Sequence, residues 1–327
     1  MNEKKDRLMY IDSIRVFVIV LVILMHLAVT YSGFGSWYYN EGAEIGVAEM
    51  ILFGFFQSFL QAFFMGFLFL ISGYFVPAAY DRKGFGKFLK DRLIRLVIPG
   101  VVYMVIINPL MSYYLADFLG EELPGFLNYY GQYMTSVWEL EGSGPMWFVL
   151  ALFLFNLVYA LVRLVRKNPS ARTVKVTPKI LFGLGLLIAL LAFLIRIVLP
   201  IGTDFLNMQF CYFVQYIVLF VAGIIAYRGD GFSRLDARTG KRCLILALAV
   251  GFGLWAAIML LGQALSKSAF ATYMFHPPII ITACLLLRPL TIMPIFKFLL
   301  TALICVPLCF AIGYFVLIRI PGLKKIL

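Results

Sequence analysis

Long apolar runs alternate with short charged segments along the whole chain. About 20 apolar residues in a helix cross the hydrocarbon core of a bilayer. Runs of about that length or longer lie at residues 10–33, 46–78, 96–116, 146–165, 179–200, 205–227, 243–263, 270–287 and 298–318. The pattern predicts an all-α protein, a polytopic transmembrane helical bundle of about nine to ten helices in one domain over residues 1–327. The run 46–78 is too long for one straight crossing, so we expect it to be tilted, extended beyond the bilayer or partly re-entrant.

The composition excludes a soluble globular protein. Hydrophobic residues make up 63% of the chain and charged residues 13%, and the mean hydropathy is +0.95, which is typical of a membrane protein. The formal net charge of +12 also fits a nucleic-acid binder. However, the cations lie between the apolar runs, so we expect no nucleic-acid partner. The five cysteines lie in or beside apolar runs without a CxxC pair, so we expect small core residues and no metal site.

The charged segments alternate in sign between the apolar runs. The N-terminus and the segments 79–95, 163–179 and 228–242 are mainly basic, whereas 34–45 and 117–144 carry only acidic charges. By the positive-inside rule we expect a retained first helix, a cytoplasmic N-terminus and a multi-pass protein of the inner (plasma) membrane. In the last third of the chain the rule fails, so the number of crossings there and the side of the C-terminus stay open.

Three ionisable residues share one side of the first predicted helix. Ten apolar residues separate Arg15 from His26. At about 100° per residue this offset gives about 1100°, roughly 20° past three turns, and an axial separation of about 16 Å. Asp12, three residues before Arg15, lies on the same side. Ionisable residues within a membrane usually serve a function. The alternative is that Asp12 pairs with Arg15 at the interface and His26 hydrogen-bonds to a neighbouring helix.

The segment 82–95 carries six cations in fourteen residues. Arg82 and Lys83 begin it, and Arg92 and Arg95 lie on one helical face where the chain re-enters the membrane. Guanidinium groups bind phosphate through paired hydrogen bonds, so the segment fits a nucleotide diphosphate that carries a further phosphate. The alternatives are a topology signal and the binding of anionic lipid headgroups.

Four further residues are weaker candidates. Trp147 starts a run at the outer interface, where it is either an anchor of the aromatic belt or a stacking platform for a sugar. Arg196 either reaches the surface and pairs with Asp204 or faces a polar cavity and holds an acceptor. Tyr273 and His276 precede two prolines that distort a helix, where His276 either packs or joins a site.

Short motifs narrow the function further. The chain has no P-loop, GxSxG, HExxH or Gly-rich dinucleotide motif, which disfavours ATP-driven transport and serine hydrolysis. Gly73, in the second run, allows the close approach of another backbone or of a ligand.

Several of these positions together resemble the acyltransferase-3 membrane family, in particular its glucan-biosynthesis and exopolysaccharide branch. The resemblance runs over nearly the whole chain and rests on Arg15-x10-His26, Ser72-Gly73-Tyr74-Phe75, Arg92-x-x-Arg95-x3-Pro99, Gly144-Pro145-Met146-Trp147-Phe148 and Tyr273-x-x-His276. It implies about ten transmembrane helices that transfer an acyl group, usually acetyl and sometimes succinyl, from cytoplasmic acyl-CoA to a hydroxyl of an extracytoplasmic glycan. Between about residues 243 and 270 the chain departs from the family pattern, which has an additional span there.

The residues and the resemblance together predict membrane O-acyltransfer. The expected site residues are Asp12, Arg15 and His26 for catalysis, Arg82, Lys83, Arg92 and Arg95 for acyl-CoA, and Trp147, Arg196, Tyr273 and His276 for the glycan acceptor. We expect His26 to act as a general base on the acceptor hydroxyl or to accept the acyl group transiently. Arg15 would orient the donor or stabilise the developing charge, and Asp12 would pair with it. Acyl-CoA is a donor substrate here, and we expect no bound cofactor.

Two other readings stay open. A proton-coupled transporter or flippase of a glycan or lipid-linked intermediate is the alternative, because the stripe through Asp12, Arg15 and His26 can also relay protons. The dense basic segment favours the enzyme, since proton relay does not need it. A non-catalytic scaffold is the third reading, and it requires that the missing span has removed the site.

Overall fold

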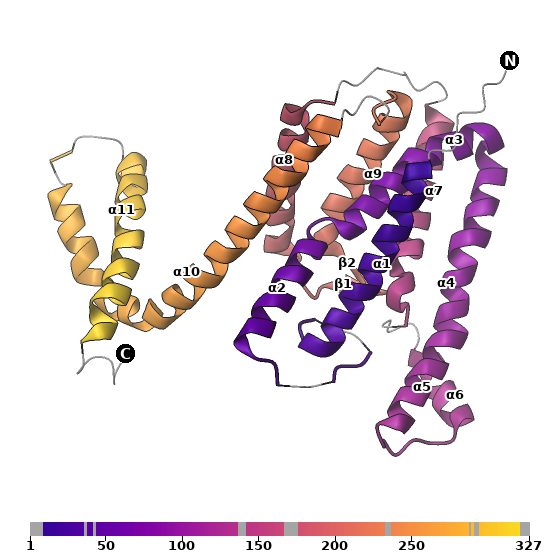
Figure 1. Cartoon of the computed structure of the whole chain (residues 1–327), viewed down its shortest axis with the longest axis horizontal. Coiled ribbons are helices and arrows are strands. Elements are labelled where there is room, and N and C mark those ends of the chain that lie inside the picture. The colour runs from indigo at the N-terminus through magenta and orange to yellow at the C-terminus, as the bar shows by residue number, and fades with distance from the viewer. Residues whose placement is uncertain are drawn as a thin grey trace. The chain divides into compact units, whose positions relative to one another are not determined.

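The computed structural model describes residues 9–35, 38–41, 44–136, 142–166, 176–232, 237–287, 289–290 and 294–320. The chain divides into two compact units, Met1–Cys243 and Leu244–Leu327, and each is described by itself. Nearly all of the described residues are helical, and one short β-hairpin is present (Figure 1). The expected all-α class is confirmed, and the expectation of one domain stays a prediction.

The first unit is built from long helices joined by shorter elements. Its longer helices are α1 (Met9–Ser32), α2 (Val47–Gln61), α3 (Phe64–Arg92), α7 (Trp147–Val165), α8 (Pro178–Val198) and α9 (Phe213–Arg228). The shorter elements are η1 (Leu93–Val97), α4 (Ile98–Val102), η2 (Tyr103–Ile107), α5 (Asn108–Phe118), α6 (Phe126–Ser136), η3 (Gly144–Met146), β1 (Asp204–Phe205), β2 (Met208–Gln209) and η4 (Phe210–Tyr212). The helix α10 (Ala237–Leu286) begins in this unit and continues in the second, which also holds α11 (Pro294–Phe315) and η5 (Leu317–Arg319).

The helices have the length and composition of a multi-pass membrane protein. The 5 described segments that are long and apolar enough to cross a membrane are Val47–Phe118, Gly144–Val165, Pro178–Val198, Phe210–Arg228 and Ala237–Ala257. Phe17–Ser32 and Leu300–Phe315 are apolar but shorter. The expected nine to ten crossings are therefore not confirmed. One reason is that the predicted runs 46–78 and 96–116 are not separate in the structure. Both belong to the single segment Val47–Phe118, in which one helix follows another directly.

The long second run is two helices. Ala62 and Phe63 separate α2 from α3, and Phe63 leaves the helical region with φ −141° and ψ −32°. Inside α3 the chain breaks again at Gly84, with φ 70° and ψ 173°, a conformation that glycine adopts without steric cost. After this second break the chain folds back on itself, because the rings of Tyr80 and Phe88 meet edge to face at 5.4 Å.

The centre of the first unit is an aromatic core between α1, α3, α7 and α9, which lie side by side (Figure 1). Phe69 of α3 is fully buried. Its ring centroid lies 4.7 Å from that of Tyr216 on α9 and 4.9 Å from that of Phe155 on α7. Val18 of α1 is 1% exposed and belongs to the same cluster. Offset and edge contacts of this kind stabilise a core beyond the area that they bury.

The helices α3 and α9 touch through their backbones at two glycines. A Cβ at Gly73 would collide with the carbonyl of Phe220, and a Cβ at Gly223 would collide with the carbonyl of Leu70. Small residues let membrane helices approach this closely. The sequence left open whether Gly73 admits a ligand or a backbone, and the structure shows that its neighbour is the backbone of α9.

Two π-helical turns follow α3, and each ends two residues before a proline, Pro99 or Pro109. Pro109 has no N–H group and its ring crowds the preceding turn, so the helix widens there. The Asn108 N–H bonds to Tyr103 O, five residues back, and Met104 O thereby loses its usual helical donor. The hydroxyl of Tyr133 donates to Met104 O instead, at 2.8 Å. The arrangement at Pro99 is the same, and there the Ile98 N–H donates to Leu93 O.

In the second unit α10 packs against α11. The Thr272 hydroxyl donates to Cys309 O at 3.4 Å. Cys305 and Cys309 are buried, as is Cys211 in the first unit, and all three are free thiols. For these three residues the expected role as small core residues is confirmed.

Candidate active site

The stripe of ionisable residues lies on one continuous helix. Because α1 is unbroken from Met9 to Ser32, the backbone positions of Asp12, Arg15 and His26 share one side of it, as the spacing predicts. The side chains of Asp12 and Arg15 lie outside the described part of the structure. Their catalytic roles therefore stay predictions.

His26 lies at the edge of the face through which α1 packs. The side chain is half-buried. On one flank of its helical position are the buried Val18 and Val29, and on the other are Ile19 and Ile23, each 55% exposed. An imidazole at such an edge is held by its neighbours and still has an accessible side. The predicted role of His26 as a general base stays a prediction.

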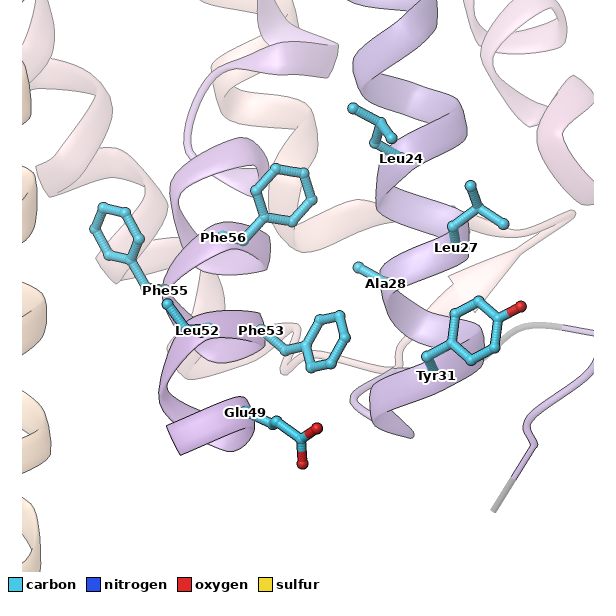
Figure 2. Close-up of a pocket in the computed structure, with 9 residues that line it drawn as sticks. All are labelled: Leu24, Leu27, Ala28, Tyr31, Glu49, Leu52, Phe53, Phe55 and Phe56. Carbon is cyan, nitrogen blue, oxygen red and sulfur yellow. The ribbon is translucent and has the colours of Figure 1, made fainter. Parts of the chain in front are cut away.

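An apolar groove of about 630 Å³ runs between α1 and α2 (Figure 2). Its lining residues are Leu24, Leu27, Ala28 and Tyr31 of α1 and Glu49, Leu52, Phe53, Phe55 and Phe56 of α2. Figure 2 shows Ala28 and Phe53 pointing into the space between the two helices. At about 100° per residue, the mean direction of the four α1 residues of the groove is roughly 150° from the direction of His26 around the helix axis. The groove therefore opens on a different side of α1 from the predicted catalytic stripe.

Polar contacts fasten the end of α1 to its neighbours. Gln57 Nε2 donates to Ser32 Oγ at 2.7 Å, and both side chains are buried. In the loop that follows, the Tyr38 hydroxyl donates to Asn108 Oδ1 at 2.6 Å and lies 3.1 Å from the Tyr103 hydroxyl. Asn108 Nδ2 in turn donates to the Tyr133 hydroxyl at 2.8 Å. The network thus joins the loop after α1 to η2, α5 and α6.

The tyrosines of this network stay protonated at neutral pH. Burial and the hydrogen bond with Tyr103 raise the pKa of Tyr38. Burial also raises the pKa of Tyr133. Both hydroxyls can therefore donate as well as accept, which keeps the network intact across the physiological range.

The glycine-rich loop before α7 is held between this network and the β-hairpin. Gly144 has φ +45°, and a Cβ there would collide with the Tyr38 hydroxyl. On the other side the Gly144 N–H donates to Asn207 Oδ1 at 3.0 Å, and Ser143 Oγ lies 2.8 Å from the same oxygen. Asn207 belongs to the tight turn of the hairpin and has φ 58°. The Tyr38 network and the β-hairpin therefore hold the loop from opposite sides, just before Trp147 begins α7.

Two of the predicted acceptor residues are engaged by aromatic rings. The Trp147 ring stacks on Tyr216 with centroids 5.7 Å apart and meets Phe148 edge to face at 6.3 Å, which ties it to the core. Arg196 is exposed, and its guanidinium lies 5.3 Å from the ring centroid of Tyr212, a cation–π distance. The structure places Trp147 and Arg196 on α7 and α8. It does not test their predicted contacts with an acceptor.

The predicted donor residues lie on both sides of the break at Gly84, with Arg82 and Lys83 before it and Arg92 and Arg95 on the folded-back segment after it. Asp91 lies between two of them, 2.8 Å from Lys83 Nζ and 3.0 Å from Arg95 Nε. The guanidinium of Arg92 lies 5.1 Å from the ring centroid of Phe88, which is fully buried, while Arg82 is exposed. Asp91 therefore holds Lys83 and Arg95 together and offsets part of their charge.

An ion-pair cluster that the sequence did not reveal joins α3, α7 and α9. Asp81 lies 2.9 Å from Arg163 Nη1 and 2.6 Å from Arg228 Nη1. The Tyr159 hydroxyl accepts from both guanidinium groups at 3.2 Å. In the sequence, Asp81 stands out only as an acidic residue within a basic segment. The sequence does not show that its partners lie far along the chain.

Two predicted residues fall outside the described side chains. Tyr273 and His276 belong to the backbone of α10, but their side chains lie outside the part of the chain that the structure describes. Their predicted roles stay predictions.

Comparison with known proteins gives the family. The sequence model of the acyltransferase-3 family, described as an acyltransferase domain, matches residues 8–264. Glucans biosynthesis protein C from Salmonella schwarzengrund and from Salmonella typhi are each 28% identical over 260 residues, which cover 74% of this chain and 64% of each relative. The chain thus aligns with somewhat under two thirds of the length of these relatives. No solved structure matches it.

The family match includes the helix with Arg15 and His26, the basic segment and the glycine-rich loop before α7. It confirms the resemblance that these residues predicted. The chain belongs to the acyltransferase-3 family.

Proposed function

We propose that the protein is a membrane O-acyltransferase that moves an acyl group, acetyl or succinyl, from cytoplasmic acyl-CoA to a hydroxyl of an extracytoplasmic glycan. The observation that carries this proposal is the unbroken helix α1, which holds Arg15 and His26 on one side within the region that the family matches. The name of the relatives, which refers to glucan biosynthesis, supports a glycan acceptor.

The chemistry follows from the two residue types. The imidazole of His26 removes the proton of the acceptor hydroxyl as its oxygen attacks the thioester carbonyl. The guanidinium of Arg15, about 16 Å from His26 along the axis, is too far from that carbonyl to stabilise its charge. It instead orients the anionic donor, and Asp12 pairs with it. The C–S bond then breaks, and His26 returns its proton to the departing thiolate. The products are an acyl ester of the glycan and free CoA.

The charge pattern supports an inner-membrane protein with a cytoplasmic N-terminus. The ends of α7 and α9 that carry Arg163 and Arg228 lie at the same end of the first unit as the start of α1 (Figure 1). The loop after α1, the glycine-rich loop and the β-hairpin gather at the opposite end. In this orientation the donor enters near Arg15 and the acceptor is modified near His26.

Sided membrane vesicles test this function. Inverted vesicles that contain the protein, supplied with acyl-labelled acetyl-CoA on their outer face, should release free CoA and retain label in the glycan fraction of the lumen. Vesicles of the opposite orientation should retain none. Movement of glycan without release of CoA would instead identify a transporter or flippase.

The basic segment gives a prediction for donor binding. Replacing both Arg92 and Arg95 by alanine should weaken acyl-CoA binding about tenfold or more, because two guanidinium–phosphate contacts are lost. The loss should shrink at high salt, since screening also weakens the two guanidinium–phosphate contacts in the unchanged protein. The measurement is a binding titration of purified protein at two salt concentrations.

A matched control removes the same charge elsewhere. Arg238 and Arg242 are exposed at the start of α10, and the double replacement Arg238→Ala with Arg242→Ala should leave donor binding nearly unchanged. If the Arg92 and Arg95 pair behaves like this control at both salt concentrations, the segment serves topology alone.

A further inference from the structure

The Arg163 and Arg228 side chains form a prearranged cationic pair. Their exposed fractions are 12% and 20%. Arg163 lies 5.1 Å from the ring centroid of Tyr80, and Arg228 lies 5.8 Å from that of Tyr227. Contacts with an aromatic face hold a guanidinium in place without neutralising it. The pair therefore keeps its position whether or not an anion is present between the two groups.

Asp81 is the anion between them in this structure. Arg228 Nη2 and Arg163 Nη1 both donate to Asp81 Oδ1, at 3.1 and 2.9 Å. The cluster of two guanidinium groups and one carboxylate has a net charge of +1. Asp81 is its most exposed member, at 36%, and it lies one turn before the backbone break at Gly84. It is therefore the member that can leave with least rearrangement.

The cluster is physically continuous with the predicted donor segment. Arg163 lies over Tyr80, Tyr80 meets Phe88, and Arg92 lies over Phe88. This stack of two cations and two rings connects the Asp81 cluster to the segment that carries Arg92 and Arg95. An anion that reaches one cation of the stack is close to the next.

We propose that Arg163, Arg228 and the Tyr159 hydroxyl form a phosphate-binding site in which Asp81 occupies the place of the phosphate. A phosphate group presents three oxygens to the donors that now converge on one carboxylate, and paired guanidinium contacts suit it geometrically. Two sources supply such a group at this surface: the phosphates of a CoA-type donor, and an anionic phospholipid headgroup. The first source rests on the proposed function, whereas the site itself does not.

Direct binding tests the site without acyl transfer. Full-length protein in nanodiscs of uncharged lipid is titrated with CoA. Asp81→Asn should tighten CoA binding about tenfold, because it removes the competing charge and keeps the volume of the side chain. Tyr159→Phe, which keeps the ring against Tyr80, should weaken binding severalfold, since one polar contact to the cationic pair is lost. Asp117→Asn, the same change at an exposed position of α5, should have no effect.

A second arm separates the two sources. The same variants in nanodiscs of uncharged lipid are titrated with water-soluble, short-chain phosphatidic acid. If Asp81→Asn tightens binding of phosphatidic acid and leaves CoA unchanged, the site stands and the phosphate comes from lipid. The shifts should persist in a His26→Ala background, so that failure of the proposed catalysis does not remove them. The proposal would be overturned if Asp81→Asn and Tyr159→Phe left the affinity for both probes unchanged and lowered the thermal stability. The cluster would then serve only to hold α3, α7 and α9 together.

Discussion

His26→Ala should lower the rate of acyl transfer by about 10² or more, as the loss of a positioned general base does. Histidine is the side chain that exchanges a proton most readily near neutral pH, and alanine offers no replacement. The measurement is label transfer from acyl-CoA in membranes that contain equal amounts of each variant, with expression checked separately.

The same substitution should leave the fold intact. His26 is half-buried at the edge of the packing face, so its removal does not empty a fully enclosed space and should cost little stability. Ile23→Ala is the matched control, because Ile23 lies one turn earlier on α1 and is 55% exposed. It should retain transfer. His276→Ala should cost less than His26→Ala if His276 packs at the Pro277–Pro278 pair. Full activity in His26→Ala would make the transporter or the scaffold the better reading.

The helical class and the shared side of Asp12, Arg15 and His26 could be predicted from the sequence because both are local properties. Apolar length alone marks a membrane helix, and the angle between Arg15 and His26 follows from one helix without knowledge of its neighbours. The number of crossings could not be predicted in this way. The end of α2 at Gln61 and the break of α3 at Gly84 depend on packing and on backbone conformation, which an uninterrupted apolar run does not encode.

The clusters around the stripe depend on contacts between distant parts of the chain. Tyr38 reaches Asn108 across 70 residues, and Asp81 reaches Arg228 across 147. The sequence showed each residue but not its partner. Pro109 is a usable sequence signal for one of these contacts, because a proline inside a helix frees a carbonyl that some donor must satisfy. The sequence indicates a close approach at Gly73, whereas its partner Gly223 is evident only from the crossing of α3 with α9.

That crossing predicts a large loss of stability for one added methyl group. Gly73→Ala should lower the free energy of unfolding by about 3 kcal/mol, at the upper end of the range for overpacked cores. The new Cβ would meet the carbonyl group of Phe220, which is backbone and cannot turn aside as a side chain would. Relief requires α3 and α9 to separate, which also pulls Asp81 away from Arg228. The measurement is thermal unfolding of purified protein in detergent.

Glycines without close neighbours supply the matched control. A Cβ at Gly54 in α2 or at Gly183 in α8 has nothing within 4 Å. Alanine there should be neutral or should raise stability by up to about 1 kcal/mol, because it favours the helix more than glycine does. Gly223→Ala should resemble Gly73→Ala, and the double variant should lose less than the sum, since the first methyl group already separates the helices. An unchanged Tm in Gly73→Ala would mean that α3 and α9 do not cross at these residues, because no other adjustment removes a collision between a Cβ and a main-chain carbonyl.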